Sequence, residues 1–204
     1  YQDFLDVRIK ITPHVLIPRV ETEEITQRII EENKHKPKLK IADLCSGSGC
    51  ISIGLKKALP QADIYSFEYS QEAIKTSQDN ALLNSTPINI IHTNLLEDET
   101  KDQNYDIIVS NPPYIRSDVI PTLMEEVKGH EPMLALDGME DGLYFYRKIV
   151  DECPDYLCKG GMLFFEIGYD QGEAVSGLME EKGFKEVCVI KDYAGLDRVV
   201  LGRI

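Results

Sequence analysis

The chain has 204 residues, of which 43% are hydrophobic and 28% charged, and its formal net charge is -13 at pH 7. This length is enough to bury a core, whereas the acidic excess argues against a broad nucleic-acid surface, which needs Lys and Arg to neutralise phosphates. The sequence shows neither a membrane-spanning apolar stretch nor a basic-then-apolar leader, so we expect a cytoplasmic protein without membrane contact or a direct nucleic-acid partner.

The first expected elements are a short strand and a helix. Apolar residues alternate with basic ones over residues 7–11, which indicates a half-exposed strand. Thr22 has the chemistry of a helix N-cap, and acidic residues follow it in the expected first turn. Ile25, Ile29 and Ile30 form the apolar stripe of this helix.

A strand, a glycine turn and a helix come next. Residues 40–44 have the pattern of a buried strand, and residues 51–59 have that of a helix. Between them lies the sequence Cys45-Ser46-Gly47-Ser48-Gly49. Glycines allow such a turn to bend tightly and to approach a ligand closely. The alternative for this segment alone is an ordinary turn between a strand and a helix.

An acidic residue ends the next expected strand. Glu68 follows the apolar run 64–67 and lies 21 positions after Gly47, where a carboxylate can accept ribose hydroxyls. A dinucleotide site would need a third glycine at the position of Ser52. Asp43, at the preceding strand end, would repel phosphates and suits a cationic ligand. The pattern therefore favours S-adenosylmethionine, which contains an adenosine but no phosphate groups and carries a positive charge.

The motif Asn111-Pro112-Pro113-Tyr114 follows a further apolar strand pattern over residues 105–110. The Asn111 side chain and the Pro112 backbone each offer a carbonyl oxygen, and two fixed acceptors can hold both hydrogens of an NH2 group. The nitrogen lone pair is then aimed at an electrophile, and Tyr114 adds an aromatic wall. The alternative is a proline-rich turn without a binding role.

The remaining pattern continues the alternation of helices and strands. Expected helices cover residues 71–83, 144–157 and 172–182, and expected strands cover residues 88–91, 162–167, 185–190 and 198–201. A connection from 115 to about 142 is long enough to have a functional role. Alternation of this kind predicts an α/β fold with a doubly wound, mostly parallel sheet. The five cysteines and four histidines show no ligand spacing, so no metal site is proposed.

Several segments together resemble the HemK/PrmC family, the glutamine methyltransferases that modify peptide chain release factors. The matching stretches are residues 11–23, 43–49, 110–115, 130–132, 137–143 and 191–200. The Leu-Ile-Pro-Arg sequence at residues 16–19 and the C-terminal stretch are more specific to this family than either site motif.

The resemblance implies a seven-stranded, Rossmann-like class I methyltransferase fold with its last strand antiparallel, preceded by a short β-hairpin-like segment. It implies transfer of a methyl group from S-adenosylmethionine to the side-chain amide nitrogen of the glutamine in the Gly-Gly-Gln motif of release factors, with S-adenosylhomocysteine as the product. We expect residues 1–20 to connect to a helical domain that this chain lacks, and residues 21–204 to form the methyltransferase domain.

The resemblance also assigns residues to roles. Residues 45–49 wrap the methionine portion of the cofactor, Glu68 binds the ribose and Asn94-Leu95 flank the adenine. The expected cofactor-binding residues are Asp43, Cys45, Ser46, Gly47, Ser48, Gly49, Glu68, Asn94, Leu95 and Asn111. The expected substrate-binding residues are Asn111, Pro112, Pro113 and Tyr114, of which Asn111, Pro112 and Tyr114 are also the expected catalytic residues.

The sequence departs from the family pattern at a few positions. Family members commonly have Gly at the position of Cys45, Pro at that of Val20 and Asp at that of Asn94. Two alternatives stay open: an amino-methyltransferase acting on adenine or cytosine of DNA or RNA, and a module that binds S-adenosylmethionine or a protein partner without turnover.

Overall fold

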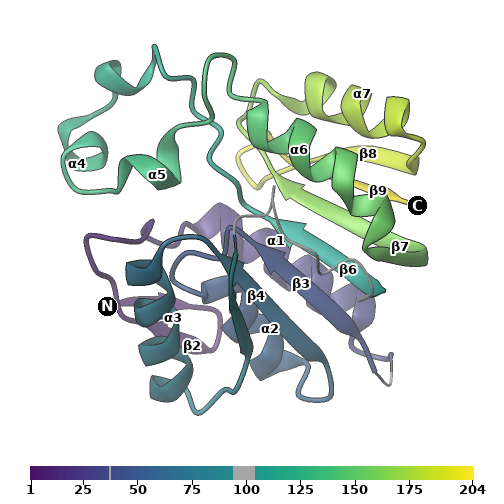
Figure 1. Cartoon of the computed structure of the whole chain (residues 1–204), viewed down its shortest axis with the longest axis horizontal. Helices are drawn as coiled ribbons and strands as arrows, with labels where there is room; N and C mark the ends of the chain where they lie inside the picture. The colour runs from purple at the N-terminus through teal and green to yellow at the C-terminus, as the bar shows by residue number, and fades with distance from the viewer. Residues whose placement is uncertain (37, 94–103) are drawn as a thin grey trace. The chain divides into compact units, whose positions relative to one another are not determined.

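A mostly parallel sheet flanked by helices organises the part of the chain that the computed structural model describes, residues 1–36, 38–93 and 104–204 (Figure 1). Its strands are β3 (Lys40–Leu44), β4 (Asp63–Glu68), β5 (Asn89–His92), β6 (Tyr105–Ser110), β7 (Leu157–Glu166), β8 (Lys185–Lys191) and β9 (Asp197–Arg203). Their order in the sheet is β5-β4-β3-β6-β7-β9-β8. The predicted α/β, doubly wound architecture is confirmed.

The chain divides into two units, Tyr1–Asp98 and Glu99–Ile204. In the first unit, β3 pairs in parallel with β4, and β4 with β5. The helices of this unit are α1 (Val20–Asn33), α2 (Cys50–Ala58) and α3 (Gln71–Leu83), with α2 packing beside both of the others. The division predicted at residue 20 remains a prediction.

A small hairpin precedes this first unit's sheet. It consists of β1 (Gln2–Phe4) and β2 (Val7–Ile9), which pair in an antiparallel manner. Phe4 and Ile9 are fully buried, whereas Arg8 is exposed. The alternation read from the sequence therefore marks a real strand, and the predicted hairpin-like segment is confirmed.

The expected start of the first helix was wrong. The N-cap of α1 is Arg19, which has an extended backbone, and Thr22 lies inside the helix with 2% of its surface exposed. Thr22 contributes its carbonyl to the Thr26 hydroxyl at 2.7 Å. Glu21 and Glu23 fall in the first turn, where carboxylates stabilise the positive end of the helix dipole. The helix can therefore start without a capping side chain.

In the second unit, β6 pairs in parallel with β7, whereas β9 is antiparallel to both β7 and β8. The expected antiparallel last strand is thus confirmed. Helices α6 (Tyr144–Glu152) and α7 (Gly172–Lys182) pack beside each other. The long connection after β6 contains three short helices: η1 (Ile120–Thr122), α4 (Glu125–Lys128) and α5 (Met133–Leu136).

The helix expected over residues 144–157 is shorter than predicted. It ends at Glu152, and a 3-10 turn, η2 (Cys153–Asp155), precedes β7. Pro154 lies in this turn, and its ring and missing N-H prevent continuation of an α-helix. No helix among the residues placed by the structure is both long and apolar enough to cross a membrane.

Candidate active site

The glycine turn and Glu68 lie at the same edge of the sheet in the first unit. Leu44 is paired with Phe67 in the parallel register of β3 and β4. The residues that follow these two strands therefore emerge side by side, at the carboxyl ends where α/β sheets bind ligands. The backbone N-H of Ser46 donates to the Phe67 carbonyl at 3.1 Å, which fixes the start of the turn against β4.

Both glycines of this turn have backbone conformations that favour glycine. Their φ angles are 53° at Gly47 and 79° at Gly49, in the left-handed region. A Cβ atom at Gly49 would overlap the Ser77 hydroxyl of α3, whereas one at Gly47 would meet no atom of the described residues within 4 Å. Gly49 thus serves close packing, and the backbone at Gly47 faces open space that a ligand can occupy.

Glu68 is held by backbone donors. Its Oε2 accepts from the Gly47 N-H at 2.7 Å, and its Oε1 accepts from the N-H groups of Tyr69 at 2.9 Å and Ser70 at 2.8 Å. A carboxylate offers about four lone-pair positions, so roughly one acceptor position remains, on Oε2. That position lies beside the open space at Gly47. A ribose hydroxyl fits this arrangement.

Asp43 lies beneath the turn and is fully buried. Its Oδ2 accepts from the Ser52 N-H at 3.1 Å and from the Ser52 hydroxyl at 2.7 Å, so it satisfies a donor in the first turn of α2. Burial raises the pKa of Asp43 to about 7, with a further increase from the charge of Glu68, although the Ser52 hydrogen bonds oppose the rise.

Two buried oxygens near the turn, Asp43 Oδ1 and Ser46 Oγ, have no hydrogen-bond partner among the residues that the structure covers. Buried polar groups of this kind are completed in native proteins by a ligand or by water. With a pKa of about 7, Asp43 is ionised in about half of the molecules at neutral pH, and that ionised form disfavours phosphates and favours a cation. The residues present therefore fit S-adenosylmethionine better than a dinucleotide.

We predict that Asp43→Asn makes the folding stability less dependent on pH. The folded-state pKa, about 7, lies above the usual 3.8, so the folded chain holds a proton that the unfolded chain releases. Stability from this group is complete below pH 3.8 and is lost as the pH rises towards 7, by at most about 4 kcal/mol at 1.36 kcal/mol per unit.

Urea unfolding at pH 5, 6, 7 and 8 checks this prediction. The unaltered chain should lose stability relative to the Asp43→Asn variant as the pH rises from 5 to 7, with little further divergence at pH 8. Parallel curves for the two proteins would show that Asp43 does not titrate in this range.

The other predicted cofactor residues of the first unit differ in burial, backbone conformation and hydrogen bonding. Cys45 is half-buried and has a φ of 59°, so a non-glycine residue occupies a left-handed position. Such a conformation costs about 1–2 kcal/mol, which explains why glycine suits this place. Ser48 is buried and its carbonyl accepts from the Asn80 side chain at 3.0 Å. Asn94 and Leu95 lie outside the described residues.

The Asn-Pro-Pro-Tyr turn lies in the second unit, directly after β6. Pro112 and Pro113 are buried, and Asn111 and Tyr114 are half-buried. The strand is confirmed over Tyr105–Ser110, and its last residue is fully buried. Buried prolines leave the turn few alternative conformations, so its carbonyl groups are held in fixed directions.

A second segment, residues 136–142, contacts the C-terminal end of this turn. The Ile115 N-H donates to the Leu136 carbonyl at 3.0 Å, and the Gly138 N-H donates back to the Ile115 carbonyl at 2.8 Å. A Cβ atom at Gly138 would lie 2.7 Å from the Tyr114 Cα. The backbone of the motif is thus packed directly against the 136–142 segment, most of which belongs to the stretch 137–143 that resembles the HemK/PrmC family.

Gln171 is a site residue that the motif analysis missed. Its Nε2 donates to the carbonyls of Tyr114 at 3.1 Å and Gly142 at 3.2 Å, and its Oε1 accepts from the Gly168 N-H at 2.9 Å. The Tyr146 hydroxyl is a weaker fourth partner at 3.4 Å. This one side chain ties the end of the motif to the loop after β7. The only sequence signal is a polar residue shortly after a strand end.

We predict that Gln171→Leu destabilises the fold by about 1–3 kcal/mol, because it leaves buried backbone carbonyls without their donor. Turnover should fall as well, since Tyr114 loses its support. Gln27→Ala is a matched control: the Gln27 amide also makes a hydrogen bond, but on the exposed face of α1, and surface changes are usually within about 0.5 kcal/mol. Chemical denaturation compares the two, and equal losses would contradict the role given to Gln171.

Comparison with known proteins connects these features to methyl transfer. Residues 20–128 match the model of the family "Methyltransferase small domain". The release factor glutamine methyltransferase of Clostridium botulinum is 41% identical over 204 residues, covering 98% of this chain and 72% of that protein.

Solved structures of methyltransferases have the same fold as this chain. A release-factor-specific protein-(glutamine-N5) methyltransferase from Alicyclobacillus acidocaldarius superposes with a TM-score of 0.59 at 26% identity, covering 96% of this chain and 98% of that one. A methyltransferase from Pyrococcus furiosus has a TM-score of 0.69 at 16% identity, covering 97% of this chain and 88% of that one, and supports the fold alone. The predicted Rossmann-like class I methyltransferase fold is confirmed.

Proposed function

The chain belongs to the release factor glutamine methyltransferases, and from this premise we propose that it methylates the side-chain amide nitrogen of a glutamine in the Gly-Gly-Gln motif of a peptide chain release factor. The single observation that carries the proposal is the identity of 41% to a release factor glutamine methyltransferase over nearly the whole chain. It is an enzyme whose methyl donor is S-adenosylmethionine.

The first unit supplies the residues that we propose for the cofactor. The carboxylate of Glu68 takes the ribose, and the backbone of residues 45–49 takes the methionine portion. The open space at Gly47 and the remaining acceptor position on Glu68 support this assignment. When bound, the cofactor supplies a methyl group activated by its sulfonium and leaves as S-adenosylhomocysteine. Asp43 supports the turn indirectly, because it accepts two hydrogen bonds from Ser52 in the first turn of α2, the helix that follows the turn.

The second unit supplies the residues that we propose for the glutamine. An amide nitrogen is a poor nucleophile because its lone pair is delocalised into the carbonyl, so the site must work through orientation. We propose that Asn111 Oδ1 and the Pro112 carbonyl accept the two amide hydrogens and that Pro113 and Tyr114 line the pocket. Their support by Gln171 and the 136–142 segment suits this task, because well-oriented groups can lower a barrier by about 7–11 kcal/mol.

The same acceptors also stabilise the positive charge that develops on the nitrogen during transfer. With the amide held in this way, the bound cofactor would supply the methyl group to the nitrogen in exchange for its bond to sulfur, and the surplus proton would leave the nitrogen for water. Asn111 and Pro112 hold the amide in this scheme, and Tyr114 restricts its movement.

The two alternatives remain less well supported. A base-modifying enzyme needs a flipped base and basic contacts to phosphates, which the net charge of -13 does not favour. A module without turnover would not need the two acceptor groups beside a rigid turn. Because release factors act in the cytoplasm, we propose that the chain works there, with the release factor as its protein partner.

The test is a transfer assay with methyl-labelled S-adenosylmethionine and three acceptors: a release factor, the same factor with its Gly-Gly-Gln glutamine changed to alanine, and duplex DNA. We expect label in the unaltered factor only. Label in DNA would favour the base-modifying alternative. Label in none of the three acceptors, with cofactor bound, would favour the module without turnover.

A further inference from the structure

A ladder of polar side chains, two on α3 and one at its C-cap, holds the N-terminal segment, defined here as residues 8–12. The contacts join Asn84 to Arg8, Asn80 to Lys10 and Thr76 to Thr12. Residues four apart in a helix are separated by about 6 Å, and residues two apart in an extended chain by nearly the same distance. The spacing of the two elements therefore matches, and they run in opposite directions.

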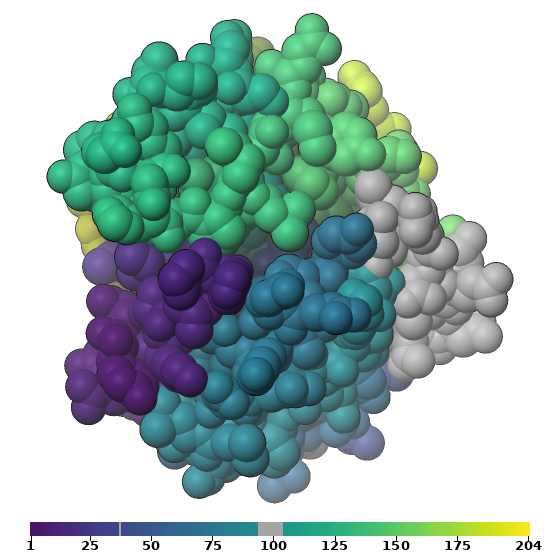
Figure 2. Space-filling model, turned by 60° about the vertical axis from the view of Figure 1, so that its left-hand side comes forward, coloured from purple at the N-terminus to yellow at the C-terminus, as the bar shows by residue number. Residues whose placement is uncertain are grey.

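Two of these contacts are paired hydrogen bonds to backbone. Asn84 accepts from the Arg8 N-H at 2.9 Å and donates to the Arg8 carbonyl at 2.8 Å. Asn80 accepts from the Lys10 N-H at 2.7 Å and donates to the Lys10 carbonyl at 3.2 Å. Each asparagine side chain thus bonds both the N-H and the carbonyl of one residue of the segment, as a neighbouring strand would. Figure 2 shows the first residues of the chain, in purple, at the surface beside the blue region that contains α3.

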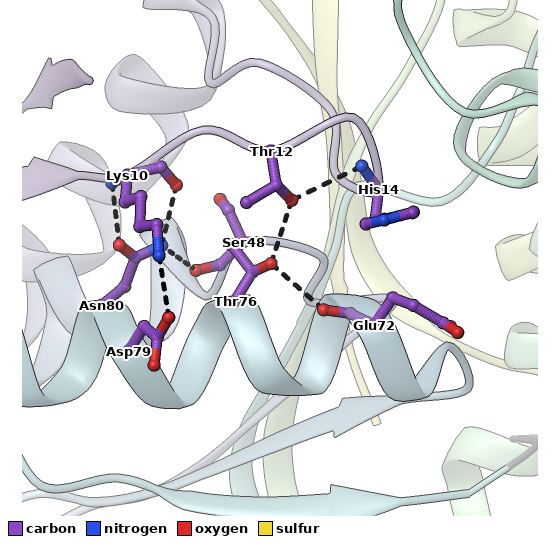
Figure 3. A network of polar contacts seen from close by, with 8 residues as sticks. All are labelled: Lys10, Thr12, His14, Ser48, Glu72, Thr76, Asp79 and Asn80. Atoms are coloured by element: carbon purple, nitrogen blue, oxygen red, sulfur yellow. Dashed lines mark hydrogen bonds and ion pairs between the residues drawn. The ribbon is translucent and has the colours of Figure 1, made fainter.

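Asn80 differs from Asn84 in one respect. Its amide nitrogen also donates to the Ser48 carbonyl at 3.0 Å, inside the glycine turn (Figure 3). Asn80 is fully buried, and this bond uses its second amide hydrogen. Asn84 instead gives its other hydrogen bond to the Asn80 carbonyl at 2.8 Å. One side chain therefore joins the N-terminal segment to the proposed cofactor turn, and the other does not.

The turn depends closely on α3 at this place. Ser48 precedes Gly49, whose hydrogen atom faces the Ser77 hydroxyl so closely that a methyl group would overlap it. A shift of α3 or loss of the Asn80 amide would therefore change the position of the Ser48 and Gly49 backbone. That backbone is part of the segment we propose to wrap the methionine portion of the cofactor.

We propose that Asn80 is a positioning residue that couples order in residues 8–12 to affinity for S-adenosylmethionine. Binding at the turn stabilises the segment, and an ordered segment strengthens binding by the same factor, because coupling between two sites is reciprocal. The inference rests on the proposed function for the identity of the ligand. It adds a connection between two parts of the first unit that the sequence motifs do not reveal.

The test compares Asn80→Ala with the control Asn84→Ala. Calorimetry with S-adenosylmethionine should show affinity weakened by about fivefold to tenfold in Asn80→Ala and changed less than about twofold in Asn84→Ala. A loss of the same size in both variants would mean that the ladder supports α3 in general, and would overturn the specific role of Asn80.

Hydrogen exchange of the unaltered chain tests the reciprocal effect without any substitution. Added S-adenosylmethionine should slow exchange of the Arg8 and Lys10 amides, which donate to Asn84 and Asn80. This slowing should disappear in Asn80→Ala at saturating cofactor. Binding by the unaltered chain without any slowing would overturn the coupling and leave the proposed function intact. If the unaltered chain bound no S-adenosylmethionine, the proposed function would fail and the coupling with it.

Discussion

Replacement of Asn111 by alanine should lower methyl transfer to a release factor by about two to three orders of magnitude, while binding of S-adenosylmethionine stays measurable. Removal of one group that stabilises transition-state charge usually lowers the rate by about this factor. Asn111 directly follows the buried end of β6 and precedes two buried prolines. The loss of its side chain removes the proposed acceptor, while the two buried prolines still restrict the conformation of the turn.

Single-turnover assays with saturating cofactor measure this loss, and calorimetry measures cofactor binding in the same variant. Asn111→Asp is the matched control, because it keeps a side-chain oxygen acceptor and should lose less activity than Asn111→Ala. Unchanged turnover in Asn111→Ala would refute the role assigned to the motif.

Replacement of Gly142 by alanine is expected to reduce turnover by about a hundredfold. Gly142 has a φ of 73°, and a Cβ atom there would lie 2.5 Å from the Tyr114 carbonyl oxygen and 2.9 Å from Gln171 Nε2. The added methyl group must therefore displace the end of the Asn-Pro-Pro-Tyr turn or break its hydrogen bond to Gln171. A misplacement of about 1 Å can cost roughly a hundredfold in rate.

Gly160→Ala is the control for this substitution. Gly160 also has a left-handed backbone, with a φ of 81°, but a Cβ atom there would meet nothing within 4 Å in the part of the chain that the structure describes. Both variants should lose about 1–2 kcal/mol of stability from backbone strain, whereas only Gly142→Ala should lose turnover. Denaturant unfolding and initial rates separate the two effects. Equal rates in both variants would show that the Tyr114 carbonyl does not need its present position.

The sequence predicted the fold well because its strands are short apolar runs bounded by clear turn residues. The strands at 40–44 and 105–110 and the helices at 71–83 and 172–182 have the predicted bounds. The helix boundaries near Thr22 and Glu152 were wrong. Acidic residues allowed α1 to start early, and Pro154 ended the helical region before the strand.

The supporting residues of the site could not be predicted in the same way. Gln171 and Asn80 act on backbone carbonyls that are 57 and 32 positions away in the chain. Every residue has a backbone carbonyl, so the identity of a residue does not indicate whether its carbonyl accepts a hydrogen bond from a distant side chain. Glu68 could be found because a ribose-binding carboxylate has a characteristic distance from the glycine turn.

The most direct test of the central claim is tandem mass spectrometry of the release factor's Gly-Gly-Gln peptide after incubation with the chain and S-adenosylmethionine. We expect one added methyl group, located on the side-chain nitrogen of the glutamine and absent when the Asn111→Ala variant replaces the unaltered chain. A methyl group on any other atom of the peptide, or an unmodified glutamine after prolonged incubation with cofactor-bound enzyme, would contradict that claim.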